Sequence, residues 1–345
     1  ELRYGRVQIV ESTAARVHVR RTYQSCDLNY RVWGDSAVED YYFFPDGFGT
    51  RVLTIQMDPA SDYELSEFIV LTPAATYPFS VLPNNMMDML FVDGVKRELK
   101  CPFSPEEQTE IATPRGIPAI YRARLHKDEP LAAIYFSPLN TKLPHTFYAP
   151  FFDQGQLVTP CYWGSHWPLA RGNSTGWAID NRIGLTPCHN SVVSWYKNRP
   201  EPIRTARLDT LDTLGQSKRM LRQTWAWLIG MSDADDERLL QWAHSFTAPP
   251  SLELEGALLE AEPYVPERRA LRLIVKDKRV CVTIKPCKVC VNPIFELLGA
   301  PESLTRVQLA GRTLDTSEYA WDGHTLWLDA TLRENAQLTI EFQDS

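Results

Sequence analysis

The chain has 345 residues, of which 44% are apolar and 23% are charged, and its formal net charge is -7. This length allows two or three domains with their own buried cores, and these proportions are average for folded globular proteins. No window approaches eighteen uncharged apolar residues, so we expect no membrane span, and the negative charge argues against a nucleic-acid partner.

The first part of the chain has the pattern of antiparallel strands. Residues 16–55 contain the alternating stretch ARVHVRRTY and the hairpin DYYFFPDGFGTRVLTI, with its turn at Pro45-Asp46-Gly47. β-Branched and aromatic residues dominate both stretches, as they do in half-buried sheets. The pattern continues in ELSEFIVLTP, MLFVDGVKREL, AIYRARL and LAAIYFSP. The sequence therefore predicts a large antiparallel β region.

The segment PCYWGSHWPLARGNSTGWAIDNRIGLTPCHNSVVSWYKNR, residues 160–199, has four tryptophans and little helical or strand periodicity. Sugars present apolar C–H faces and hydroxyl edges, so a sugar cleft needs aromatic platforms beside hydrogen-bonding side chains. The candidate substrate-binding residues of this segment are Trp163, Trp167, Trp177, Trp195, Asn173 and Arg199. The alternative is that the tryptophans belong to a core and the polar side chains satisfy loop backbone.

One clear helix is predicted in SDADDERLLQWAHSF, around residues 233–246. Ser232 is the expected N-cap, and apolar residues recur at three- and four-residue spacing at Leu239, Trp242, Ala243 and Phe246. The acids at its start lack the glycine and the ligand spacing of a calcium loop. They are therefore interpreted as complements of the helix dipole.

After this helix, TAPPSLELEGALLEAEPYVPERR resembles a connector, and a domain boundary is predicted near Pro249. The last eighty residues return to the strand pattern in ALRLIV, RVCVTI, RVQLAG, AQLTIEF and the hairpin YAWDGHTLWL. The predicted domains are residues 1–248, with the candidate sugar cleft, and residues 249–345.

This order of YYFFPDGFGTR-type hairpins, Trp/His/Asn-rich segment, short helix and terminal sandwich resembles the β-supersandwich part of carbohydrate-active enzymes. Galactose mutarotases and the sheet domains of several polysaccharide lyases and glycosidases belong to that superfamily. The resemblance implies a mainly β fold, with a large antiparallel β-supersandwich, one short helix and a small C-terminal β-sandwich. It also implies a carbohydrate ligand. Many such lyases carry a helical toroid before the sheets, so either an upstream domain completes the protein or its sheets work alone.

The residue types of the segment favour a polysaccharide lyase acting on a uronate-containing polymer. Elimination needs a group that neutralises the substrate carboxylate and a base that removes the adjacent proton. Asn190 or Arg171 is the candidate neutraliser, and His166 or His189 is the candidate base. Tyr196 either protonates the leaving oxygen or is itself the base.

Two alternatives remain open. A glycoside hydrolase needs two carboxylates flanking the bond, and the candidates near aromatic residues are Asp153, Asp180, Glu39 and Asp40. A non-catalytic carbohydrate-binding or accessory module is the third interpretation. Mutarotation would need a glutamate base, and residues 160–199 contain no glutamate.

The seven cysteines are scattered and do not suggest a dense disulfide framework. Cys287 and Cys290 form a lone Cys-x-x-Cys, which leaves room for a structural zinc only if further ligands come from elsewhere. We expect no cofactor, and a polysaccharide or oligosaccharide as partner. The chain begins at Glu1 without a recognisable leader, which leaves room for a removed signal sequence or upstream domain; a secreted or periplasmic location is the expectation.

Overall fold

The structure of the protein is a computed structural model that describes residues 4–26, 31–61, 65–72, 83, 85, 87–99, 106, 113–126, 128–142, 146–148, 158–159, 188–195, 199–211 and 214–343. Within these residues the fold is mainly β, with several antiparallel sheets and one short α-helix, as the sequence predicted. Within the described ranges, no helix combines the length and the apolar character that a membrane span requires.

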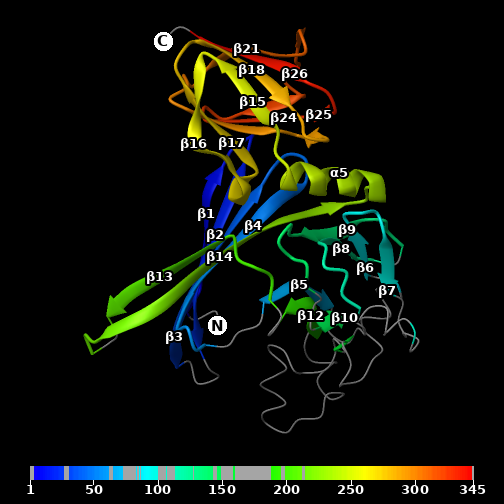
Figure 1. Cartoon of the computed structure of the whole chain (residues 1–345), viewed down its shortest axis with the longest axis vertical. Coiled ribbons are helices and arrows are strands. Elements are labelled where there is room, and N and C mark those ends of the chain that lie inside the picture. Colours follow the sequence, from blue (N-terminus) through cyan, green and yellow to red (C-terminus); the bar gives the residue numbers. More distant parts are fainter. Residues whose placement is uncertain are drawn as a thin grey trace.

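A ten-stranded sheet forms the body of the molecule, and it extends from the lower left of Figure 1 to the side where β7 lies. Its strand order is β1-β2-β3-β4-β14-β9-β8-β6-β7, and β13 pairs with the outer half of β14. The strands are β1 (Arg6–Ser12), β2 (Val17–Cys26), β3 (Val32–Phe43), β4 (Phe48–Met57), β6 (Met87–Phe91), β7 (Lys96–Leu99), β8 (Ala119–Arg124), β9 (Ala132–Phe136), β13 (Arg204–Leu211) and β14 (Ser217–Ser232).

A four-stranded sheet lies beside the large one, below β9 in Figure 1. Its strands are β5 (Leu65–Thr72), β10 (Thr146–Tyr148), β11 (Val158–Thr159) and β12 (Cys188–Trp195). β12 falls in the segment that the sequence indicated to be irregular, and that expectation was wrong for these residues. Two adjacent valines, Val192 and Val193, do not make the period-two alternation by which a strand is recognised. The strand forms because its backbone pairs with β5.

The helix α5 (Asp236–Thr247) covers the end of the large sheet where β8 and β9 lie. Leu239, Trp242, Ala243 and Phe246 are buried there, as their spacing predicted. The N-cap is Asp235 and not Ser232, because Asp235 Oδ1 accepts a hydrogen bond from the backbone N–H of Arg238 at 2.8 Å. The Ser232 hydroxyl accepts from Ala234 N–H instead, one turn too early to cap the helix.

The remaining strands form two five-stranded sheets and a two-stranded ribbon above α5 in Figure 1. One sheet contains β15 (Ser251–Glu255), β18 (Arg279–Lys285), β26 (Ala336–Phe342), β21 (Leu304–Leu309) and β22 (Arg312–Thr313). The other contains β16 (Ala257–Val265), β17 (Ala270–Val275), β20 (Ile294–Leu298), β24 (Thr325–Leu328) and β23 (Tyr319–Trp321). The ribbon pairs β19 (Cys290–Val291) with β25 (Thr331–Leu332).

The two five-stranded sheets enclose a core of Leu, Val, Ile and Phe side chains, such as Leu273, Val282, Phe295 and Leu338. In the part of the chain that the structure describes, strands up to β14 pair only among themselves and strands from β15 on do the same. The sheets therefore change at α5, while the domain division at Pro249 stays a prediction.

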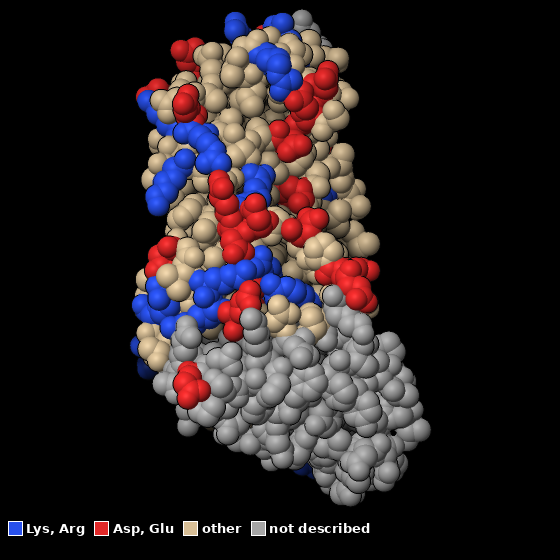
Figure 2. All heavy atoms as spheres, turned by 90° about the vertical axis from the view of Figure 1, so that its right-hand side faces the viewer, with Lys and Arg blue, Asp and Glu red and all other residues tan. Residues whose placement is uncertain are grey.

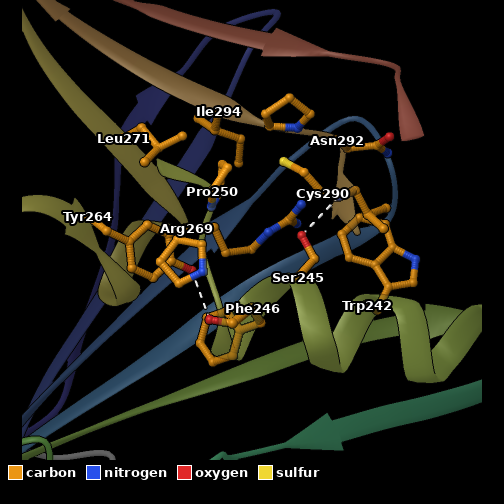
Figure 3. Close-up of a pocket in the computed structure, with 13 residues that line it drawn as sticks. Trp242, Ser245, Phe246, Pro250, Tyr264, Arg269, Leu271, Cys290, Asn292 and Ile294 are labelled. Atoms are coloured by element: carbon orange, nitrogen blue, oxygen red, sulfur yellow. Dashed lines mark hydrogen bonds between the residues drawn. The ribbon is translucent and has the colours of Figure 1, made fainter. Parts of the chain in front are cut away.

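Buried polar contacts join the large sheet to the C-terminal sheets. Asp46, in the β3–β4 turn, accepts hydrogen bonds from Arg269 at 3.0 Å, Asn292 at 3.2 Å and Trp327 Nε1 at 3.2 Å. Glu296 of β20 binds Arg16 at 2.7 Å, just before β2. Figure 3 shows the neighbouring space between α5 and these strands, where Arg269 lies over the Trp242 ring at 4.5 Å. The cavity there measures about 20 Å³, which is room for a water molecule and not for a sugar.

Candidate functional site

Most of the predicted site residues fall outside the described residues. These are His166, Arg171, Tyr196, Trp163, Trp167, Trp177 and Asn173. His189 and Asn190 lie on β12, where their backbones pair with Leu71 and Val70 of β5, but the description does not extend to their side chains. Arg199 is half-buried at the start of the segment that leads to β13.

Trp195 lies in the core at the end of β12, with no exposed surface. Its Nε1 donates a hydrogen bond to the Lys142 carbonyl at 3.2 Å. The indole packs against Tyr121 and Tyr135, each with its ring centroid 5.7 Å away. Trp195 is thus a core residue, the alternative that the sequence left open, and not an exposed stacking platform.

A polar cluster lies on one face of the β2–β3–β4 part of the large sheet, which we call the inner face. It is the face of the odd-numbered residues Tyr23, Glu39, Tyr41 and Arg51. Glu39 is only 3% exposed, yet three donors converge on its carboxylate. Tyr23 donates at 2.8 Å, Arg51 Nε donates at 3.2 Å, and Tyr41 donates to the same oxygen as Arg51.

These contacts fix the protonation of the cluster. Burial favours the neutral form of Glu39, but the charge of Arg51 and the hydrogen bonds from Tyr41, Arg51 and Tyr23 outweigh it and lower the pKa to about 2. Burial and the negative Glu39 raise the pKa of Tyr23 above its ordinary value. At neutral pH the cluster therefore holds an ionised carboxylate and a protonated Tyr23 phenol.

A half-buried ring, an exposed ring and exposed aliphatic side chains lie along the same face. The rings of Tyr41 and Phe43 lie nearly parallel, with centroids 6.2 Å apart and planes 11° apart, and Phe43 is 42% exposed. On the edge strand β1, Val7 pairs with Arg21 and Ile9 pairs with Val19. Val7 and Ile9 are 69% and 70% exposed. The arrangement offers a sugar both apolar surface for its C–H face and polar groups for its edges.

Arg21 brings a positive charge to this surface. It lies on β2 opposite Glu39 of β3, and its guanidinium carbon is 4.6 Å from the centre of the Tyr23 ring. A guanidinium binds a carboxylate through two parallel hydrogen bonds, which suits an acidic sugar. The inner face therefore places an arginine beside a phenol that keeps its proton.

The inner face runs into the core that holds β12. Arg51 lies over the Trp227 ring at 5.0 Å, and Trp227 contacts the Tyr135 ring at 5.9 Å. Tyr135 in turn packs on Trp195, the last residue of β12. This continuous series of rings joins the polar cluster to the strand that carries His189 and Asn190.

The two described carboxylates considered for hydrolysis do not face one another. Asp40 follows Glu39 on β3, and successive residues of a strand point to opposite faces. Asp40 binds Arg20 at 2.7 Å and His18 at 2.6 Å on the other face of the sheet. Glu39 and Asp40 therefore cannot flank one glycosidic bond; Asp153 and Asp180 lie outside the described residues.

The sequence reading located strands here but missed this group of side chains. Arg21, Tyr23, Tyr41 and Phe43 are the ones that it did not select. The signal was present, because ARVHVRRTY and EDYYFF place arginine, tyrosine and phenylalanine at alternate positions of neighbouring strands. Their common face depends on the register between β2 and β3, which is set by a pairing that the pattern alone does not fix.

The described cysteines do not gather. Cys281 lies on β18, where its sulfur is 3.8 Å from Thr339 Oγ1, while Cys290 is buried beside Ser245 and Cys287 is exposed. Burial raises the pKa of the Cys290 thiol to about 12, so this thiol stays protonated. Among the residues that the structure describes, no group of three or more His, Cys, Asp or Glu side chains could hold a metal ion.

The chain matches no protein-family model and no curated protein. The interpretation of the inner face therefore depends on its own chemistry.

Proposed function

We propose that the protein is a polysaccharide lyase that cleaves a uronate-containing polysaccharide by β-elimination. The observation that carries the proposal is the inner-face group, in which Arg21 and the protonated Tyr23 lie beside the buried Glu39, while the exposed Phe43 lies further along β3 against Tyr41. The β-supersandwich resemblance of the sequence points to the same class of ligand.

The chemistry assigns one role to each type of side chain. Arg21 pairs with the uronate carboxylate and stabilises the charge that develops there when the adjacent carbon loses its proton. The electron pair of that C–H bond forms the new carbon–carbon double bond, and the bond from the next carbon to the glycosidic oxygen breaks. Tyr23, which holds its proton at neutral pH, gives that proton to the leaving oxygen. Glu39 positions the phenol and takes no part in bond making.

We expect the base to come from residues 160–199, where His166 and His189 are the candidates. Asn190 and Arg171 remain candidates to assist Arg21 at the carboxylate. Hydrolysis is the weaker alternative, because Glu39 and Asp40 lie on opposite faces of β3 and because Glu39 is held ionised with a pKa of about 2. A general acid for hydrolysis would need a raised carboxyl pKa.

The test is incubation of the protein with a panel of uronate-containing polymers, read by the ultraviolet absorbance of the unsaturated product and by reducing ends. Arg21→Ala should lower turnover about 10²- to 10³-fold, as loss of an oxyanion donor does. Tyr23→Phe should lower it about 10²- to 10⁴-fold if the phenol is the acid. Single variants His166→Ala, His189→Ala, Asn190→Ala and Tyr196→Phe examine the residues of the segment.

Matched controls come from the opposite face of the same strands. Arg20→Ala and Tyr42→Phe make the same chemical changes, and Arg20 and Tyr42 lie on the face of Asp40 and His18. Both should retain turnover. Full activity in the Arg21 and Tyr23 variants would remove the assignment, and reducing ends without the chromophore would indicate hydrolysis. Binding of a polymer without any product would leave a carbohydrate-binding module.

A further inference from the structure

The face of the large sheet opposite the Glu39 cluster, which we call the outer face, carries a row of mostly hydroxyl and guanidinium side chains. The row follows the strand register from β1 to β13, one residue from each strand. Its members are Arg6, Thr22, Val38, Thr54, Thr224 and Arg204. The Thr54 and Thr224 hydroxyls are 3.0 Å apart, so both side chains lie on this one face.

A second row lies beside the first. It contains Ser36, Gln56, Arg222 and Ala206 in register on β3, β4, β14 and β13. The second row and the part of the first row from Val38 to Arg204 line a hollow of about 680 Å³. At about 4.8 Å between neighbouring strands, the four strands under the hollow span about 14 Å.

The positive charge of this hollow comes from Arg222 on β14, because Arg204 on β13 is paired with Glu267 and Glu262. Arg222 is exposed, and its register neighbours on the flanking strands are Gln56 and Ala206, which carry no charge. The Arg204 side chain is 60% exposed and binds Glu267 at 2.9 Å. The floor offers hydroxyl and amide groups, which exchange hydrogen bonds with hydroxyls of a sugar, and none of the lining side chains is aromatic.

We propose that this hollow is a second binding surface for a strand of an acidic polysaccharide, separate from the inner-face site. Arg222 pairs with a carboxylate or sulfate group of the polymer. Thr54, Thr224 and Gln56 contact the sugar hydroxyls. The choice of a polysaccharide over another polyanion rests on the proposed function. Because the site lies across the sheet from the Glu39 cluster, it holds the polymer without touching the bond that is cleaved.

The experiment measures the Kd for polygalacturonate and for chondroitin sulfate by affinity electrophoresis and calorimetry, with an uncharged glucan as the neutral comparison. Arg222→Ala should weaken binding of the acidic polymers about tenfold, the worth of about one charge-assisted hydrogen bond. Arg222→Glu should weaken it further. The difference between wild type and variant should shrink as salt rises, since screening acts over about 10 Å at 0.1 M.

Arg219→Ala is the matched control. Arg219 lies on β14, three residues from Arg222, with its side chain 85% exposed and on the other face. The Arg219→Ala variant loses the same charge as Arg222→Ala, and its Kd for the acidic polymers should equal that of the wild type. Circular dichroism confirms that each variant folds.

The outcomes separate this inference from the lyase assignment. If short oligosaccharides yield unsaturated product and the Arg222 variants bind acidic polymers with the wild-type Kd, the second surface is overturned and the lyase assignment stands. Lost binding in those variants without product from any polymer would overturn the lyase and keep the surface. Three results would each overturn the second surface. Arg219→Ala could weaken binding as much as Arg222→Ala does, or the neutral glucan could bind as tightly as the acidic polymers. The third is that the wild type binds no acidic polymer.

Discussion

At the scale of single residues, Asp46 shows how one side chain acquires two tasks. The sequence identifies it as part of a Pro-Asp-Gly turn, and its carboxylate does accept a hydrogen bond from Phe48 N–H at 2.9 Å within that turn. The same carboxylate also binds Arg269, Asn292 and Trp327, more than two hundred residues away. The first role follows from local turn chemistry, whereas the second requires packing of the C-terminal sheets.

We predict that Asp46→Ala lowers the free energy of unfolding by about 3–5 kcal/mol, as removal of one partner of a buried ion pair does. The Asp46 and Arg269 side chains are each 5% exposed, so the change leaves Arg269 charged and buried. Urea unfolding followed by tryptophan fluorescence gives the value. Asp93, also in an Asp-Gly turn, is the control: it is 43% exposed and bound to Arg115, and Asp93→Ala should cost no more than about 1 kcal/mol. Equal losses at both positions would refute the special role of Asp46.

At the scale of elements, the sequence predicted α5 well because its apolar spacing records directly which face is buried. The predicted N-cap was wrong, because Ser232, Asp233, Asp235 and Asp236 are all of types that cap helices. Contacts with β7 and β8 select among them. Asp236 binds Lys96 at 3.2 Å and Arg122 at 2.8 Å, which draws the first turn of the helix onto the sheet. Figure 2 shows the basic and acidic groups that alternate on this side of the molecule.

We predict that Asp235→Ala destabilises the protein by about 1 kcal/mol, the usual cost of a lost N-cap. Asp233→Ala, two residues earlier and outside the helix, should change the free energy of unfolding by less than about 0.5 kcal/mol. Thermal unfolding followed by circular dichroism measures both. A larger loss for Asp233 than for Asp235 would place the cap elsewhere.

The strand β12 is the element that the sequence did not predict. Its neighbours in the chain carry most of the predicted site, and its own residues pair with β5, more than a hundred residues earlier. A continuous apolar run identifies a strand such as β9, with the sequence AAIYF, but the sequence CHNSVVSW has neither such a run nor a period-two alternation. The fold class was thus readable from the sequence, while the location of the candidate site on the inner face depended on register.

At the scale of the whole molecule, ionised carboxylates tie strands and sheets together, and this sets a dependence on pH. Glu39 joins β2, β3 and β4 through Tyr23 and Arg51. Glu296 joins the start of β2 to the C-terminal sheets through Arg16 and Arg268. Burial opposes ionisation of Glu296, but its two arginines outweigh it and lower the pKa. Both carboxylates therefore bind a proton more readily in the unfolded chain than in the folded protein.

The sign of the pH effect follows from this difference. The stabilisation from Glu39 is complete above its ordinary pKa of 4.5 and is lost as the pH falls toward about 2. We predict that the free energy of unfolding decreases over this range, and that Glu39→Gln lowers stability at pH 7 while making the decrease shallower. Glu262→Gln, at a side chain that is 81% exposed, serves as the control and should reproduce the wild-type curve. Urea unfolding at several pH values between 7 and 2 provides the comparison. If the Glu39→Gln curve runs parallel to that of the wild type, the carboxylate is not held ionised by Arg51 and the two phenols, and the protonation of Tyr23 on the inner face loses its electrostatic basis.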